Sequence, residues 1–88
     1  MAYTKATIVT WDGTDHPEAF LNELSAEVTR LTSEGKTDGE RTVLDDGSSK
    51  RIWLDQAAVD EWIGIVQGLA TTHSVTLVSH TSEDYTAP

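Results

Sequence analysis

The chain has 88 residues, enough for one domain, and 15 acidic against six basic side chains give it a net charge of −9. This balance argues against nucleic-acid and anionic-membrane partners, because the chain repels phosphate groups unless its few cations cluster. It has no cysteine, which excludes disulfides, thiolate catalysis and zinc–thiolate sites. No run approaches the roughly 18–20 apolar residues of a membrane span, and the first residues lack the apolar core of a signal peptide, so we expect a soluble, cytoplasmic protein.

The first third of the chain predicts a strand and a helix. Residues 3–11 are rich in Thr, Ile, Val and aromatic residues and end at an Asp-Gly turn signal, which indicates a β-strand. A helix is expected to follow, with Asp15 as its N-cap, Glu18 completing a capping box and Gly35 as its stop signal. Its apolar side chains recur at helical spacing: Phe20, Leu21, Leu24, Val28 and Leu31.

The middle of the chain predicts a hairpin. Residues 41–54 contain two short strand candidates on either side of an Asp-Gly turn sequence. A two-residue turn places Val43 on the same face as Ile52, whereas a three-residue loop places Leu44 there. The pattern leaves both registers open.

The last third predicts a second helix and strand. Asp55 is the expected N-cap of a helix with a broad apolar face, and a strand follows over residues 74–80. Gly64 and Gly68 lie inside this helix, where each costs about 1 kcal/mol relative to alanine. We therefore expect a neighbouring backbone to approach them closely, in the sheet or in another chain.

The order strand, helix, strand, strand, helix, strand predicts an α+β ferredoxin-like fold, β-α-β-β-α-β, with a four-stranded antiparallel sheet and two helices on one face. We expect a single domain at residues 1–80 and a loose polar tail at residues 81–88. The side chains expected on the helix-covered face are Ala6, Ile8, Ile52, Leu54, Val75 and Leu77. Those expected on the open face are Lys5, Val9, Trp11, Arg51, Trp53, Val78 and His80.

An open sheet face with two tryptophans is the main functional expectation from the sequence. Open faces are normally polar, and an apolar patch of this kind marks a binding surface. We therefore expect two copies to pack these faces together in a closed homodimer. Partial cover of the face by Tyr85 of the tail is the alternative.

The segment Arg51-Ile52-Trp53-Leu54-Asp55-Gln56-Ala57-Ala58, which leads into Trp62, resembles small ferredoxin-like proteins of the dimeric α/β-barrel type. In those proteins a strand with a basic and an aromatic residue runs into an acid-capped, Ala-rich helix. The resemblance covers roughly residues 3–80 and implies dimerisation through the sheets. That class includes cofactor-free monooxygenases, haem-degrading enzymes and isomerase-like proteins, and no catalytic signature carries over residue by residue.

Metal and RNA binding have little support in the sequence. His16 lies beside Asp12 and Asp15, but a turn followed by a helix cap accounts for these residues, and further ligands are missing. RNA-recognition domains share the predicted topology, yet their Gly-rich, aromatic third-strand signature is absent here.

Two classes of function follow from these patterns. The first, which we expect, is a non-catalytic homodimeric interaction or assembly protein that uses the open sheet face. The alternative is a small cofactor-free enzyme or a small-molecule binder with an apolar pocket. The pocket or interface candidates are Trp11, Arg51, Trp53, Trp62 and His80. We expect no catalytic residue, metal site or cofactor.

Overall fold

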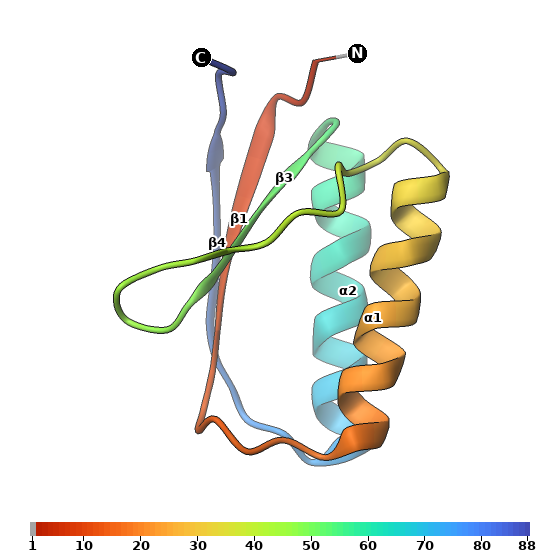
Figure 1. The fold of residues 1–88 in the computed structure, drawn as a ribbon, viewed down its shortest axis with the longest axis vertical. Helices are drawn as coiled ribbons and strands as arrows, with labels where there is room; N and C mark the ends of the chain where they lie inside the picture. Colours follow the sequence, from red (N-terminus) through yellow and green to blue (C-terminus); the bar gives the residue numbers. More distant parts are fainter. Residues whose placement is uncertain (1) are drawn as a thin grey trace.

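The computed structural model of the chain describes residues 2–88. Its elements are β1 (Lys5–Trp11), α1 (Glu18–Ser33), β2 (Thr42–Val43), β3 (Ser49–Trp53), α2 (Gln56–His73) and β4 (Leu77–Asp84). The four strands form one antiparallel sheet in the order β2-β3-β1-β4, and both helices lie on one side of it (Figure 1). The predicted α+β ferredoxin-like layout is confirmed.

The two helices begin differently. α2 begins as predicted, since the Asp55 carboxylate accepts a 2.9 Å hydrogen bond from the backbone N–H of Ala58. α1 begins after Pro17 without a side-chain cap, so the capping box predicted for Asp15 and Glu18 is wrong. Proline fixes the backbone angle φ for entry into the first turn, which lets the helix start without that hydrogen bond.

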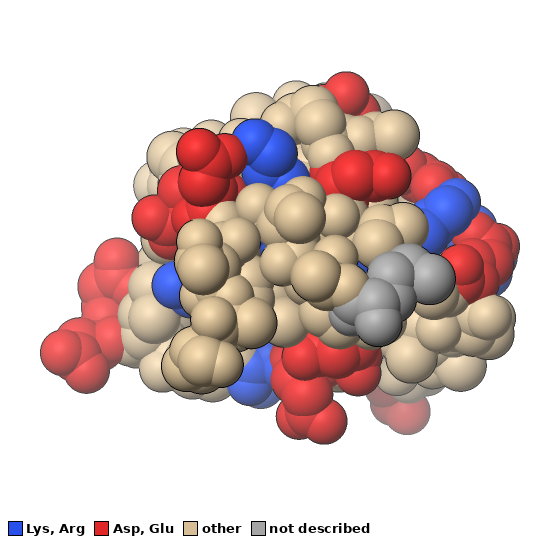
Figure 2. Space-filling model, turned by 90° about the horizontal axis from the view of Figure 1, so that it is seen from above, with Lys and Arg blue, Asp and Glu red and all other residues tan. Residues whose placement is uncertain are grey.

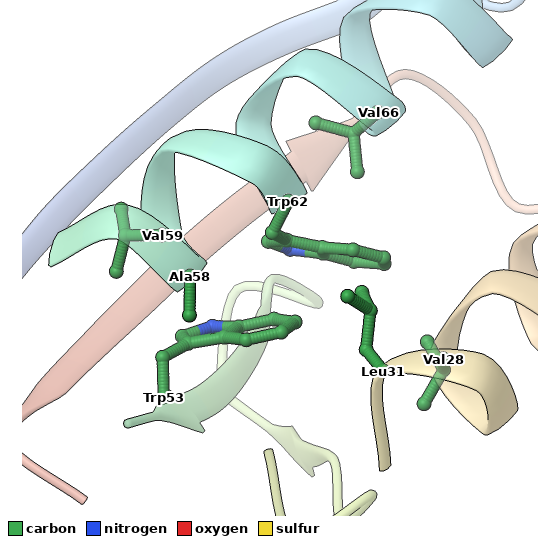
Figure 3. Close-up of a cluster of buried hydrophobic side chains, with 7 residues drawn as sticks. All are labelled: Val28, Leu31, Trp53, Ala58, Val59, Trp62 and Val66. Carbon is green, nitrogen blue, oxygen red and sulfur yellow. The ribbon is translucent and has the colours of Figure 1, made fainter. Parts of the chain in front are cut away.

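β1 and β3 present the opposite faces from those predicted, whereas Leu77 of β4 packs against the core as expected. Trp53 is 0 % exposed beneath α2, where the centre of its indole lies 5.2 Å from that of Trp62 (Figure 3). The Trp53 Nε1–H donates a 2.9 Å hydrogen bond to the buried Thr7 hydroxyl. Ala6 pairs with Ile52 on the other, open face. The expectation of an open face carrying the tryptophans is therefore wrong, and the homodimer prediction loses its main support.

The size of the side chains explains this inversion. Alternation along a strand fixes which residues share a face but not which face points inward, and both faces of β1 contain apolar residues. Trp53 buries far more apolar area than Ala6 or Ile52, so the helices stabilise the fold most by covering its face. Thr7 can accompany it because the hydrogen bond from Trp53 satisfies the hydroxyl.

The β2–β3 hairpin closes through a three-residue loop. Thr42 pairs with Lys50, and the N–H of Leu44 donates a 2.8 Å hydrogen bond to the Ser48 carbonyl. This register places Leu44 on the same face as Lys50 and Ile52. The three-residue alternative is thus the right one, although the face that these residues share is the open one.

β4 begins later and ends later than the predicted last strand. It reaches Asp84, whose carboxylate lies 2.6 Å from Lys5 Nζ, and the N–H of Tyr85 then donates to the Thr4 carbonyl at 2.9 Å. Residues 81–84 therefore belong to the sheet and not to a loose tail. β4 is an edge strand that is exposed along most of its length, so its composition is polar and resembles that of a tail.

The two helices contribute unequally to the core. α2 contacts β1, β3 and β4, whereas α1 contacts α2, and no Cα atom of α1 lies within 8 Å of a Cα atom in any strand. The main buried cluster consists of Val28, Leu31, Trp53, Ala58, Val59, Trp62 and Val66 (Figure 3). α1 contributes Val28 and Leu31 from its C-terminal half to this cluster, and the partly buried Leu24 from its N-terminal half packs against it.

Gly64 and Gly68 face open space. A Cβ atom built at either position would meet no atom within 4 Å outside its own helix. The prediction that the sheet approaches these glycines closely is therefore wrong. Both glycines lower the helix propensity of α2, and no packing contact inside this chain compensates for it.

Charged side chains lie at the surface in mixed groups. Figure 2 shows acidic side chains around the margin at the end of the molecule with both termini, with basic ones beside some of them. Glu61 of α2 binds Lys36 at 2.7 Å and Arg30 of α1 at 3.2 Å, so it links the two helices. No helix in the described part of the chain is long and apolar enough to cross a bilayer.

Candidate functional site

A cleft of about 270 Å³ lies between the N-terminal half of α1 and the sheet. Its apolar walls are Val9, Trp11, Phe20, Leu21, Leu24 and Trp62. A second, more open hollow of about 640 Å³ continues along α1 toward its C-terminal end and also contacts Arg41 and Arg51. The cleft therefore opens into a longer groove beside the helix.

Packing at the two ends of α1 explains why the cleft stays open between them. At the start of the helix, the Phe20 ring stands edge-on to Trp11 with ring centres 4.9 Å apart, and it also contacts His73 at 5.9 Å. At the other end, Leu31 is completely buried in the core. Between these two anchors Leu24 is only partly buried, since α1 keeps its distance from the sheet.

Arg51 brings a charge into this apolar cleft. It projects from β3, and its guanidinium carbon lies 5.4 Å from the centre of the Trp62 ring, a cation–π distance. Its guanidinium forms one hydrogen bond with residues 2–88, a long one of 3.4 Å to the Glu40 carbonyl. Burial lowers the pKa of Arg51, the charge of Arg41 lowers it further, and the Asp38 carboxylate acts in the opposite direction.

A further polar group of the cleft wall is buried. The Nε1 atom of Trp62 is shielded from solvent and has no hydrogen-bond partner among residues 2–88. Buried indole N–H groups usually find an acceptor. Trp62 therefore lines the cleft with its ring while its N–H group stays unpaired and shielded from solvent.

The cleft brings together three of the five predicted candidates. Trp11, Arg51 and Trp62 line it. Trp53 lies directly below Trp62 in the core, where no ligand reaches it. His80 lies on the exposed strand β4, with its Nε2 atom 3.3 Å from the side-chain amide nitrogen of Gln67 in α2, and is not part of the cleft.

The sequence did not identify Arg41 and His16 as parts of this site. His16 lines the cleft beside Phe20, with ring centres 5.6 Å apart, whereas the sequence pattern assigns it only to a turn before a helix. Arg41 lines it because the three-residue hairpin loop places residue 41 level with Arg51. The sequence left the register of the hairpin open, and this register decides whether Arg41 lies next to Arg51.

The arrangement is suited to binding. The walls are apolar, two guanidinium groups border them, and no group of three metal-ligating side chains occurs among residues 2–88. Comparison with protein-family models, with curated proteins and with solved structures finds no match to this chain.

Proposed function

We propose that the chain binds a small amphipathic molecule in the cleft between α1 and the sheet. The observation that carries this proposal is an apolar cleft of about 270 Å³ with a few polar groups at its border. Small-molecule sites are typically concave, mostly apolar and about 300–1,000 Å³ in volume. The cleft lies just below that range by itself and within it together with the groove.

The open cleft is costly for so small a domain. Closing α1 onto the sheet would stabilise the fold by about 25 cal/mol for each Å² of apolar surface removed from water. A chain of 88 residues has little stability to spare. A ligand present at a concentration of about 100 times its dissociation constant would raise the free energy of unfolding by about 2.7 kcal/mol. Binding therefore gives a physical reason for a cleft that the fold alone does not need.

A neutral fluorescent dye tests this proposal. N-phenyl-1-naphthylamine emits in apolar surroundings, and we expect saturable binding with one dye per chain. Leu24→Trp, which fills the cleft, should weaken binding by at least about tenfold. Val78→Trp is the control, because residue 78 is exposed on β4, outside the cleft. Absence of saturable binding, or equal binding by Leu24→Trp and wild type, would refute the proposal.

Self-association through the open sheet face is a second candidate. It is favoured by a hollow of about 330 Å³ on that face, bordered by Leu44, Ile52 and Tyr85. Light scattering on wild type and Ile52→Glu tests it: a dimer that the substitution converts to a folded monomer supports the candidate, and a wild-type monomer refutes it.

A cytoplasmic location stays a prediction from the sequence, and cell fractionation would test it.

A further inference from the structure

The six basic side chains of the chain fall into two groups. Four form ion pairs, namely Lys5–Asp84 at 2.6 Å, Arg30–Glu27 at 2.7 Å, Lys36–Glu61 at 2.7 Å and Lys50–Glu83 at 3.6 Å. The other two, Arg41 and Arg51, form none with residues 2–88, although the chain has 15 acidic side chains. Both line the cleft. The cations without a carboxylate partner are therefore those that face the proposed binding site.

The hairpin register sets these two cations against each other. Thr42 pairs with Lys50, so the next step outward places Arg41 level with Arg51 on the helix side of the sheet. Like charges directly opposite each other destabilise an antiparallel pair. An anion between the two guanidinium groups would relieve their repulsion and would also compensate the partial burial of Arg51.

We infer that Arg41 and Arg51 bind the carboxylate of an amphipathic organic acid whose apolar body lies in the cleft, an inference that rests on the proposed function. Guanidinium groups recognise carboxylates through two parallel N–H···O hydrogen bonds. Contact with Trp62 orients the Arg51 guanidinium before the ligand arrives. The body of the acid would then extend past Leu21 and Leu24, which also border both hollows, toward Trp11 and Phe20, which line the cleft alone.

The geometry also sets the orientation and size of the acid. Both arginines border the cleft and the adjoining groove, so they stand where the one opens into the other. The carboxylate therefore lies at this opening and the apolar body points inward. A volume of about 270 Å³ is at the small end of ligand sites, which favours a monocyclic or bicyclic acid.

A matched pair of ligands isolates the charge. 1-Naphthaleneacetate and 1-naphthaleneacetamide have the same ring system, and calorimetric titration at pH 7 and low salt measures the affinity of each. We expect the acid to bind about ten- to a hundredfold more tightly than the amide, because hydrogen bonds to charged groups are the strong ones. Added salt should reduce this preference.

Three variants locate the preference. Arg51→Met and Arg41→Met keep an apolar stem and remove one charge each, and each should lower acid affinity by about tenfold while amide affinity stays within about threefold. Lys50→Met is the matched control, since it removes a charge from the residue beside Arg51 but on the opposite face of the sheet. It should leave the acid-to-amide ratio unchanged.

The possible results separate the two proposals. If wild type binds acid and amide equally, or if Lys50→Met loses as much preference as Arg51→Met, the carboxylate receptor is refuted while binding in the cleft stands. If neither compound binds and the neutral dye does not bind either, the proposed function fails and this inference fails with it.

Discussion

The two helices cover the same face of the sheet in different ways. α2 packs directly onto the strands, so that Trp62 and Val66 are almost completely buried against it. α1 packs onto α2 and keeps its backbone away from the strands, which leaves the cleft under its N-terminal half. The comparison teaches that one helix supplies most of the core here. The other helix is then free to form the wall of a site.

The apolar stripes of the helices explain this division. α2 presents a broad face whose indole and branched side chains meet Trp53 on β3. α1 has a narrower stripe, and it is held by Phe20 at one end and Leu31 at the other. Leu21, next to Phe20, is 47 % exposed. The apolar stripe of α1 is therefore only partly covered by the rest of the chain, whereas a surface helix normally buries such a stripe against the core.

Truncation in each half gives the largest expected contrast. Trp53→Ala should lower the free energy of unfolding by about 3–5 kcal/mol, because it leaves a large cavity in the closed half and an unpaired Thr7 hydroxyl. Leu21→Ala in the open half should lower it by less than about 1 kcal/mol. Urea unfolding measures both. Similar losses would mean that α1 closes onto the sheet in solution.

Gly39 tests how firmly the loop after α1 is seated against that helix. It has a φ of 80°, and a Cβ built on it would lie 2.9 Å from the Thr32 hydroxyl. Gly39→Ala should therefore cost about 1–2 kcal/mol for the backbone conformation, plus the clash. Gly13→Ala is the control, with a φ of 77° and open space around it, and thermal unfolding should show the smaller loss there. Equal losses would show that the loop yields freely.

The exposed glycines of α2 predict a change in the opposite direction. Gly64→Ala and Gly68→Ala should each raise the free energy of unfolding by about 0.5–1 kcal/mol, since a methyl group meets no neighbour and restricts the unfolded chain. Chemical denaturation measures the gain. A loss at either position, dependent on protein concentration, would indicate that a second chain packs against these glycines.

Removing a charge from the cleft should leave the fold intact or strengthen it slightly. Arg51→Met should raise the free energy of unfolding by up to about 0.5 kcal/mol without ligand, because it ends the repulsion by Arg41. Lys50→Met removes a cation that has a carboxylate partner and should bring no gain. A clear loss in Arg51→Met would show that the contact of Arg51 with Trp62 stabilises the fold by more than the repulsion from Arg41 destabilises it.

The ion pairs between the helices predict the mildest effect, a slope with pH. Lys36 and then Arg30 lower the pKa of Glu61 by hydrogen bonding. A carboxyl group with a lowered pKa in the folded state stabilises the fold above its unfolded value of about 4.3 and loses this contribution as the pH falls through the folded value. Stability should thus decline below about pH 4.3. The decline should be shallower in Glu61→Gln. An unchanged slope of stability against pH in this variant would show that the Glu61 ion pairs do not stabilise the fold.

The sequence was enough for the order of elements, because strand alternation, helical spacing and the Asp55 cap are local signals. It was not enough for the direction in which the faces point. That choice depends on Trp53 reaching both Trp62 and Thr7, residues far away in the chain. The length of β4 was missed for a similar reason, since its polar residues are held by hydrogen bonds to β1 rather than by burial.

The candidate site depended on the same kind of long-range information. The sequence identified Arg51 and Trp62 as candidates, but it grouped them with Trp53 and His80, which lie elsewhere. Arg41 joins Arg51 only in one of the two hairpin registers. No local pattern shows which cations will find carboxylate partners, because the partners come from distant segments.

All three tryptophans of the chain stand at the cleft or immediately beneath it. Trp11 and Trp62 form part of its wall, and Trp53 lies 5.2 Å from Trp62. The tryptophan emission of the protein therefore arises from this one region. An occupant that touches Trp62 alters the surroundings of an indole that is in contact with the core. The chain thus has a built-in optical reporter, and ligands can be screened on the unlabelled protein.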